Sequence, residues 1–144
     1  MRILFPIARV LFALIFLVAA PRHFTQGGVQ HATDLGVPLA KILVPISGAM
    51  ALAGGLSLVV GWRARWGAWT LVAFLIPVTV MMHAFWRQPD AAAFHVQQAM
   101  FMKNLSMLGA ALLLTQFGAG RMSIDDLKQR SRALPERALA ARGD

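Results

Sequence analysis

Residues 66–86 read WGAWTLVAFLIPVTVMMHAFW, and this stretch decides the class of fold. It holds no Asp, Glu, Lys or Arg, and it is as long as the roughly 20 apolar residues that a helix needs to cross a bilayer. A soluble amphipathic helix would carry charges along its outward face, and a strand would be shorter or would alternate. The stretch therefore predicts a membrane-spanning helix.

Three further stretches have the same character, and each of them holds at most one cation. They are residues 3–20, 42–62 and 99–117. The whole chain is 58% apolar and only 14% charged, with a mean hydropathy of +0.61, whereas soluble domains are about half apolar and a quarter charged. We therefore expect an all-α fold, an integral membrane four-helix bundle embedded in the lipid bilayer.

The basic residues predict the orientation of this bundle. The net charge is +8, but so apolar a chain lacks the polar surface that a nucleic-acid-binding module needs, so nucleic acid is not an expected partner. Three cations flank one end of the spans, Arg22, Lys41 and Arg87, and nine lie at the other. The nine are Arg2, Arg63, Arg65, Arg121, Lys128, Arg130, Arg132, Arg137 and Arg142. The positive-inside rule then places both termini in the cytoplasm.

The chain divides into a four-helix domain, residues 1–120, and a basic cytoplasmic tail, residues 121–144. The tail should begin as a short surface helix and end frayed. In the longest connection, residues 21–41, Gly27 and Gly28 should interrupt regular structure.

Polar residues within spans are the best pointers to function in a membrane protein. Arg9 lies near the cytoplasmic end and is expected to have a structural role, either reaching the interface or pairing with Asp125 or Asp126. Lys103 either extends to the outer interface or faces a ligand, and the adjacent Asn104 needs a hydrogen-bond partner.

His83 is either an interfacial histidine or a ligand-binding, proton-handling residue. Because His83, Lys103 and Asn104 fall near the same outer end, the sequence predicts a polar pocket there, with Trp86 and Phe101 beside it. The histidine spacings fit no metal motif, so no metal site is expected. No catalytic residues can be assigned, because nucleophile-elbow, phosphate-loop and HExxH motifs are all absent.

Several short motifs occur in an order that resembles the DoxX family of small membrane proteins. They are Gly36-Val37-Pro38, Gly54-Gly55-Leu56-Ser57-Leu58, Met82-His83-Ala84-Phe85-Trp86 and Phe101-Met102-Lys103-Asn104-Leu105. The resemblance implies a multi-pass four-helix protein of the bacterial inner membrane, and some members of that family take part in quinone-linked redox complexes. Many of them carry a Glu where this chain has Ala51, and its loss argues against proton relay.

Together, the residues and the resemblance lead to one main hypothesis. The chain would be an accessory subunit of a membrane redox complex that binds a quinone or another small apolar ligand through His83, Trp86, Lys103 and Asn104. Two alternatives stay open: a non-enzymatic scaffold that docks partners through its basic tail, and, ranked last, a small-solute transporter.

Overall fold

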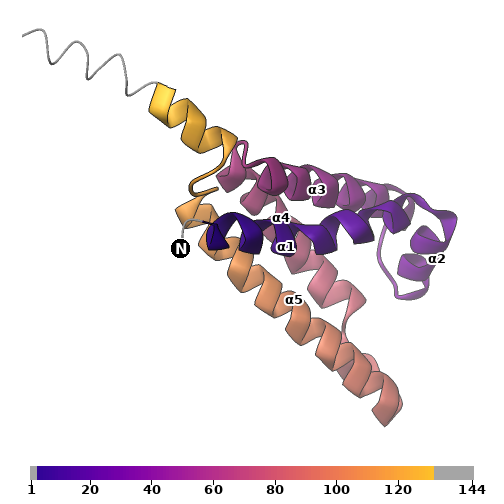
Figure 1. Cartoon of the computed structure of the whole chain (residues 1–144). Helices are drawn as coiled ribbons and strands as arrows, with labels where there is room; N and C mark the ends of the chain where they lie inside the picture. Colours follow the sequence, from indigo (N-terminus) through magenta and orange to yellow (C-terminus); the bar gives the residue numbers. More distant parts are fainter. Residues whose placement is uncertain (1–2, 132–144) are drawn as a thin grey trace, which may run out of the picture.

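The computed structural model describes residues 3–131, and every regular element in that part of the chain is helical (Figure 1). The helices are α1 (Leu4–Ala19), α2 (Gln26–Asp34), α3 (Ala40–Val60), α4 (Ala64–Met82) and α5 (Ala91–Phe117), with short 3-10 turns η1 (Ala20–Phe24) and η2 (Phe85–Arg87). Residues 124–131 are helical as well. The predicted surface helix of the tail is therefore present, while its expected frayed end lies outside the described residues.

Within residues 3–131, three helical segments are long and apolar enough to cross a membrane: Leu4–Phe24, Ala40–Val60 and Ala64–Arg87. They coincide with the first three predicted spans. The predicted fourth span, residues 99–117, forms the C-terminal part of α5 but is not among the three. Its helix begins earlier than expected, at Ala91, and its first half carries polar residues. The structure thus supports an all-α membrane protein with three candidate spans.

Helices α3 and α4 form a tight antiparallel hairpin. Gly61 ends α3 in the left-handed conformation (φ 71°), which a residue without a side chain adopts at little cost. Further along the hairpin, a Cβ on Gly54 would lie 2.6 Å from the Leu71 side chain and 2.9 Å from the Gly67 carbonyl. Small residues therefore let the two backbones approach closely, as in other membrane helix pairs.

The connection between α1 and α3 contains a helix, so the expectation that Gly27 and Gly28 interrupt regular structure is wrong. Thr25 caps α2, because its hydroxyl accepts a hydrogen bond from the Gly28 N–H at 3.1 Å. A Cβ on Gly28 would collide with the carbonyl of Arg22. The glycine at that position thus serves close packing at the start of a helix.

The helices meet at one end and diverge at the other. In Figure 1, α1 and α3 run together toward α2, while α5 and the end of α4 point away from them. Near the meeting end the apolar core is continuous across the helices and includes Ala13, Leu58, Ala68, Leu71 and Ala111. The molecule therefore has a packed, closed end and an open end between two arms. One arm consists of α1, α2 and α3, and the other consists of α5 and the end of α4.

Candidate functional site

A cavity of about 580 Å³ lies between the two diverging arms, and we call it the lateral pocket. It is lined by residues of α1, η1, α2, α3, α4 and α5. Most of its wall is apolar. Ile15, Val18 and Ile46 line it and are also exposed on the outer surface of the candidate spans. The pocket therefore opens sideways, through the surface that faces lipid.

Asn104 is the most deeply buried polar residue of the pocket, with 4% of its surface exposed. Its side chain makes no hydrogen bond to any residue between 3 and 131. In that range the one fully enclosed side-chain nitrogen or oxygen without a partner is the Arg9 Nε, so the Asn104 amide atoms are not sealed in the core but reach the cavity. Asn104 is thus an unused donor and acceptor at the wall of a cavity, where a ligand can reach it.

His83 and Lys103 line the same pocket as Asn104. The His83 Nδ1 lies 2.9 Å from the Gln97 Oε1, so that α4 and α5 are joined by one hydrogen bond. An amide oxygen only accepts, so Nδ1 donates, and the Nε2 of the neutral ring is an acceptor. Lys103 is exposed, and its Nζ has only a weak contact with the Met100 Sδ at 3.5 Å.

Two further histidines line the lateral pocket from the opposite arm, His23 and His31. The His23 Nδ1 lies 2.8 Å from the Ser47 hydroxyl, which gives its own proton to the Val44 carbonyl at 2.7 Å. His23 therefore donates to Ser47. Sequence reasoning did not assign either histidine to the site, because a sequence cannot show which helices a residue between two spans will face.

Trp86 does not line the lateral pocket. It belongs to an aromatic cluster beside the first half of α5. The centre of its ring lies 5.8 Å from the ring centre of Phe101 and 5.1 Å from that of Phe85, and both pairs are edge-on. Phe85 contacts Phe94 and Phe101 in the same way. These residues hold η2 against α5 and so set where His83 lies.

Arg9 lies at the closed end, far from this pocket, and only 4% of it is exposed. Its Nη1 donates to the Ala119 carbonyl at 2.7 Å and its Nη2 to the Val59 carbonyl at 3.4 Å. Arg9 forms no ion pair within the described part of the chain. The guanidinium therefore joins α1 to the ends of α3 and α5 through backbone oxygens.

Asp125 acts at the same end of the molecule. Its carboxylate accepts hydrogen bonds from the backbone N–H groups of Arg63 at 2.8 Å and Ala64 at 3.0 Å, where α4 begins. Its own N–H donates to the Gly61 carbonyl at 2.9 Å. A carboxylate at a helix N-terminus satisfies N–H groups that have no partner within the helix. Asp125 thereby fixes the segment after α5 to the α3–α4 hairpin.

The lateral pocket can hold a molecule with a large apolar body and one polar end. It offers an amide, imidazole acceptors and one ammonium group near its rim. Among residues 3–131, no three His, Asp or Glu side chains are grouped so that they could hold a metal ion. The arrangement thus suits binding by burial and hydrogen bonds.

Comparison with known proteins places the chain among membrane proteins. Inner membrane protein YqjF of Escherichia coli (strain K12) is 30% identical over 123 residues, which cover 84% of this chain and 88% of the relative. Inner membrane protein YphA of the same organism is 30% identical over 125 residues, 85% of this chain and 89% of the relative. The Surfeit locus protein 4 homolog of Schizosaccharomyces pombe is 28% identical over 103 residues, which are 71% of this chain and 33% of that protein. No solved structure matches the chain.

These relatives and the three apolar helices establish that the protein is a multi-pass protein of the bacterial inner membrane. The assignment to the DoxX family is wrong, because the family whose model matches is SURF4, over residues 6–131. The motifs that suggested DoxX are short and mostly apolar, so they do not distinguish one family of membrane helices from another. The chain belongs to the SURF4 family.

Proposed function

We propose that the lateral pocket binds a small amphipathic molecule from the bilayer, and that quinones are the ligand class to test first. The observation that carries this proposal is the unpartnered amide of Asn104, a residue that is 4% exposed, on the wall of a mostly apolar cavity. Ligand sites in proteins are mostly apolar concave pockets with a few polar groups that fix orientation. A quinone, with its apolar tail and carbonyl oxygens, matches that pattern.

Each polar group has a distinct task in this proposal. The Asn104 amide donates to a ligand carbonyl, and the His83 Nε2 accepts from a hydroxyl. Lys103 supplies positive charge, which would favour an oxygen that carries negative charge after reduction. In its wider form, the proposal makes the chain a ligand-binding subunit of a membrane redox complex.

The test is direct binding of a short-chain ubiquinone to the purified protein in lipid nanodiscs. Asn104→Leu keeps the branched shape of the side chain and removes the amide. We expect its affinity to fall about tenfold, because loss of one buried hydrogen bond costs about 1.5 kcal/mol. Ser106→Ala is the matched control, since its hydroxyl bonds only the Met102 carbonyl on an exposed face of α5. Equal affinities for the two variants, or no binding by the unaltered protein, would reject the proposal.

We further propose that α5 is a fourth span, so that both termini lie in the cytoplasm and the boundary near residue 120 separates the membrane domain from the tail. Helix α5 has 27 residues, about 40 Å at 1.5 Å per residue, which exceeds the roughly 30 Å hydrocarbon core. Its exposed apolar residues include Leu105, Leu112, Leu113 and Phe117. The nine-to-three distribution of cations supports the orientation.

The chain contains no cysteine, so single-cysteine variants can test this topology cleanly. We expect Gln129→Cys to react with a membrane-impermeant maleimide only in inside-out vesicles, and Asp34→Cys only in right-side-out vesicles. Labelling of both sites from the same side would contradict an even number of spans. The opposite pattern for both sites would contradict the orientation.

A further inference from the structure

A second hollow of about 580 Å³ lies at the closed end, and we call it the basic hollow. It is formed where α4 begins, where α5 ends and at the start of the helical segment 124–131. Four cationic residues line it: Arg63, Arg65, Arg121 and Lys128. The basic hollow shares no lining residue with the lateral pocket.

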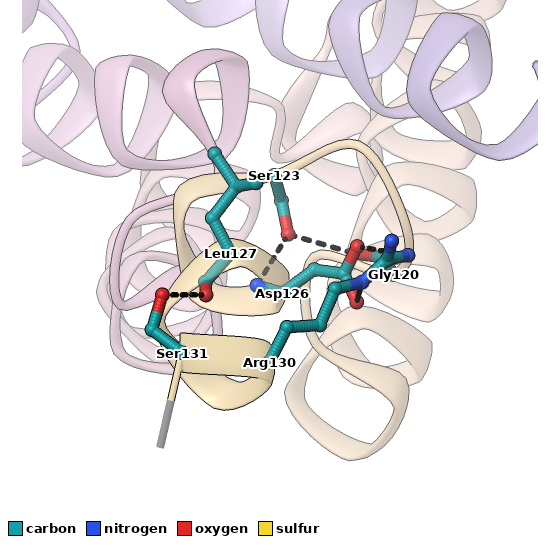
Figure 2. Close-up of polar contacts among 6 residues, drawn as sticks. All are labelled: Gly120, Ser123, Asp126, Leu127, Arg130 and Ser131. Carbon is teal, nitrogen blue, oxygen red and sulfur yellow. Dashed lines mark hydrogen bonds and ion pairs between the residues drawn. The ribbon is translucent and has the colours of Figure 1, made fainter. Parts of the chain in front are cut away.

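The two carboxylates in the basic hollow are already engaged. Asp125 accepts from the backbone at the start of α4. Figure 2 shows Asp126 held within the segment 124–131, where Arg130 pairs with its carboxylate at 2.9 Å and the Ser123 hydroxyl accepts from its N–H at 3.1 Å. Among residues 3–131, none of the four lining cations forms an ion pair. The hollow therefore keeps an excess of positive charge.

Local packing holds some of these cations in place. The Arg63 guanidinium lies 5.3 Å from the centre of the Trp62 ring, and the Lys128 Nζ lies 5.7 Å from it. A Cβ on Gly118, which has a positive φ of 68°, would come within 3.4 Å of the Arg65 Nε. The glycine thus lets Arg65 lie close against the chain at the end of α5.

The position of the hollow indicates the kind of anion. It sits at the ends of the candidate spans, where the exposed Trp66 lines it and the exposed Trp62 lies against two of its lining cations, Arg63 and Lys128. Tryptophan marks the level of lipid headgroups, and basic pockets between membrane helices at that level bind anionic headgroups. We propose that the basic hollow binds the phosphate of an anionic phospholipid, with Arg65 and Arg121 as its main contacts.

Quenching of tryptophan fluorescence by brominated lipids tests this proposal. Trp66 lines the hollow, Trp62 contacts two of its cations, and Trp69 lies in the first turns of α4 at the same end, while a Trp86→Phe background removes the fourth tryptophan. The protein is placed in phosphatidylcholine bilayers that contain brominated phosphatidylglycerol or, for comparison, brominated phosphatidylcholine. We expect phosphatidylglycerol to associate at least about fivefold more strongly, because each basic residue near the surface contributes roughly that factor.

Arg65→Gln combined with Arg121→Gln should bring this ratio close to one. Lys41→Gln combined with Arg87→Gln removes the same charge at the other end and should leave the ratio unchanged. If the first pair does not fold, Lys128→Gln on the exposed tail helix should still lower the ratio. Equal ratios for the two pairs, or no preference in the starting protein, would overturn the proposal. Loss of the preference in inorganic phosphate, but not in chloride at equal ionic strength, would assign the hollow to free phosphate and would also overturn it.

Discussion

The closed and open ends of the molecule differ in how their buried polar residues are bonded. At the closed end, two nitrogens of the Arg9 guanidinium donate to backbone carbonyls while its Nε has no partner among residues 3–131, and the Asp125 carboxylate accepts from two backbone N–H groups. At the open end, Asn104 is as buried a residue as Arg9, but its amide bonds no described residue and lines a cavity. Polar groups bonded to backbone stabilise the fold. A polar group left free at a cavity is available to a ligand.

The largest expected effect comes from breaking the closed end at Arg9. Arg9→Met keeps most of the apolar stem but leaves the Ala119 and Val59 carbonyls without their donor. We expect the free energy of unfolding to fall by about 3 kcal/mol, since buried polar groups that lose a charged partner are costly. Unfolding in sodium dodecyl sulfate measures this change. A loss below about 0.5 kcal/mol would show that Arg9 is dispensable for the junction.

A smaller loss is expected at Gly61, which brings three parts of the closed end together. In Gly61→Ala the new Cβ would lie 2.5 Å from the Ser123 Cβ and 2.6 Å from the Arg9 Nη1, at a positive φ of 71°. We expect a loss of about 2 kcal/mol from the left-handed backbone and the collisions.

Gly109→Ala is the matched control for that substitution. Nothing lies within 4 Å of a Cβ at Gly109, which is inside α5. Alanine should therefore raise the stability of the helix by up to about 1 kcal/mol. If both alanine variants raised the free energy of unfolding, or both lowered it, the close approach at Gly61 would not contribute to stability.

The smallest effect on stability is expected at the open end. Asn104→Leu removes an amide that has no partner, so the free energy of unfolding without ligand should stay within about 0.5 kcal/mol or rise slightly. The same variant should lose quinone affinity, as described above. A large loss of stability would show that Asn104 supports the fold, and the contrast between the two ends would then disappear.

The sequence predicted what depends on local composition. Long apolar stretches predicted the three candidate spans to within four residues at each end, because a helix in lipid must satisfy its own backbone. The grouping of His83, Lys103 and Asn104 at one end followed from topology alone. The expectation that Gly27 and Gly28 interrupt regular structure is wrong, because both lie inside α2. Gly28 is needed there for its close contact with the Arg22 carbonyl, which depends on the fold of η1.

Other parts of the site depend on how helices cross, which composition does not record. Trp86 packs on Phe101 outside the lateral pocket, whereas His23 and His31 line the pocket. Both findings follow from the divergence of the two arms. The contacts of Arg9 with carbonyls, and of Asp125 with the start of α4, join residues 50 or more positions apart.

The sideways opening of the lateral pocket determines from which phase a ligand reaches it. A ligand that enters between α1 and α5 comes from the lipid phase and never has to pass through water. Its occupancy is then governed by its mole fraction in the membrane, where apolar molecules accumulate. Even a weak binding site would be filled in a membrane rich in the ligand. Dilution with extra lipid should empty the pocket, although the amounts of protein and ligand stay the same.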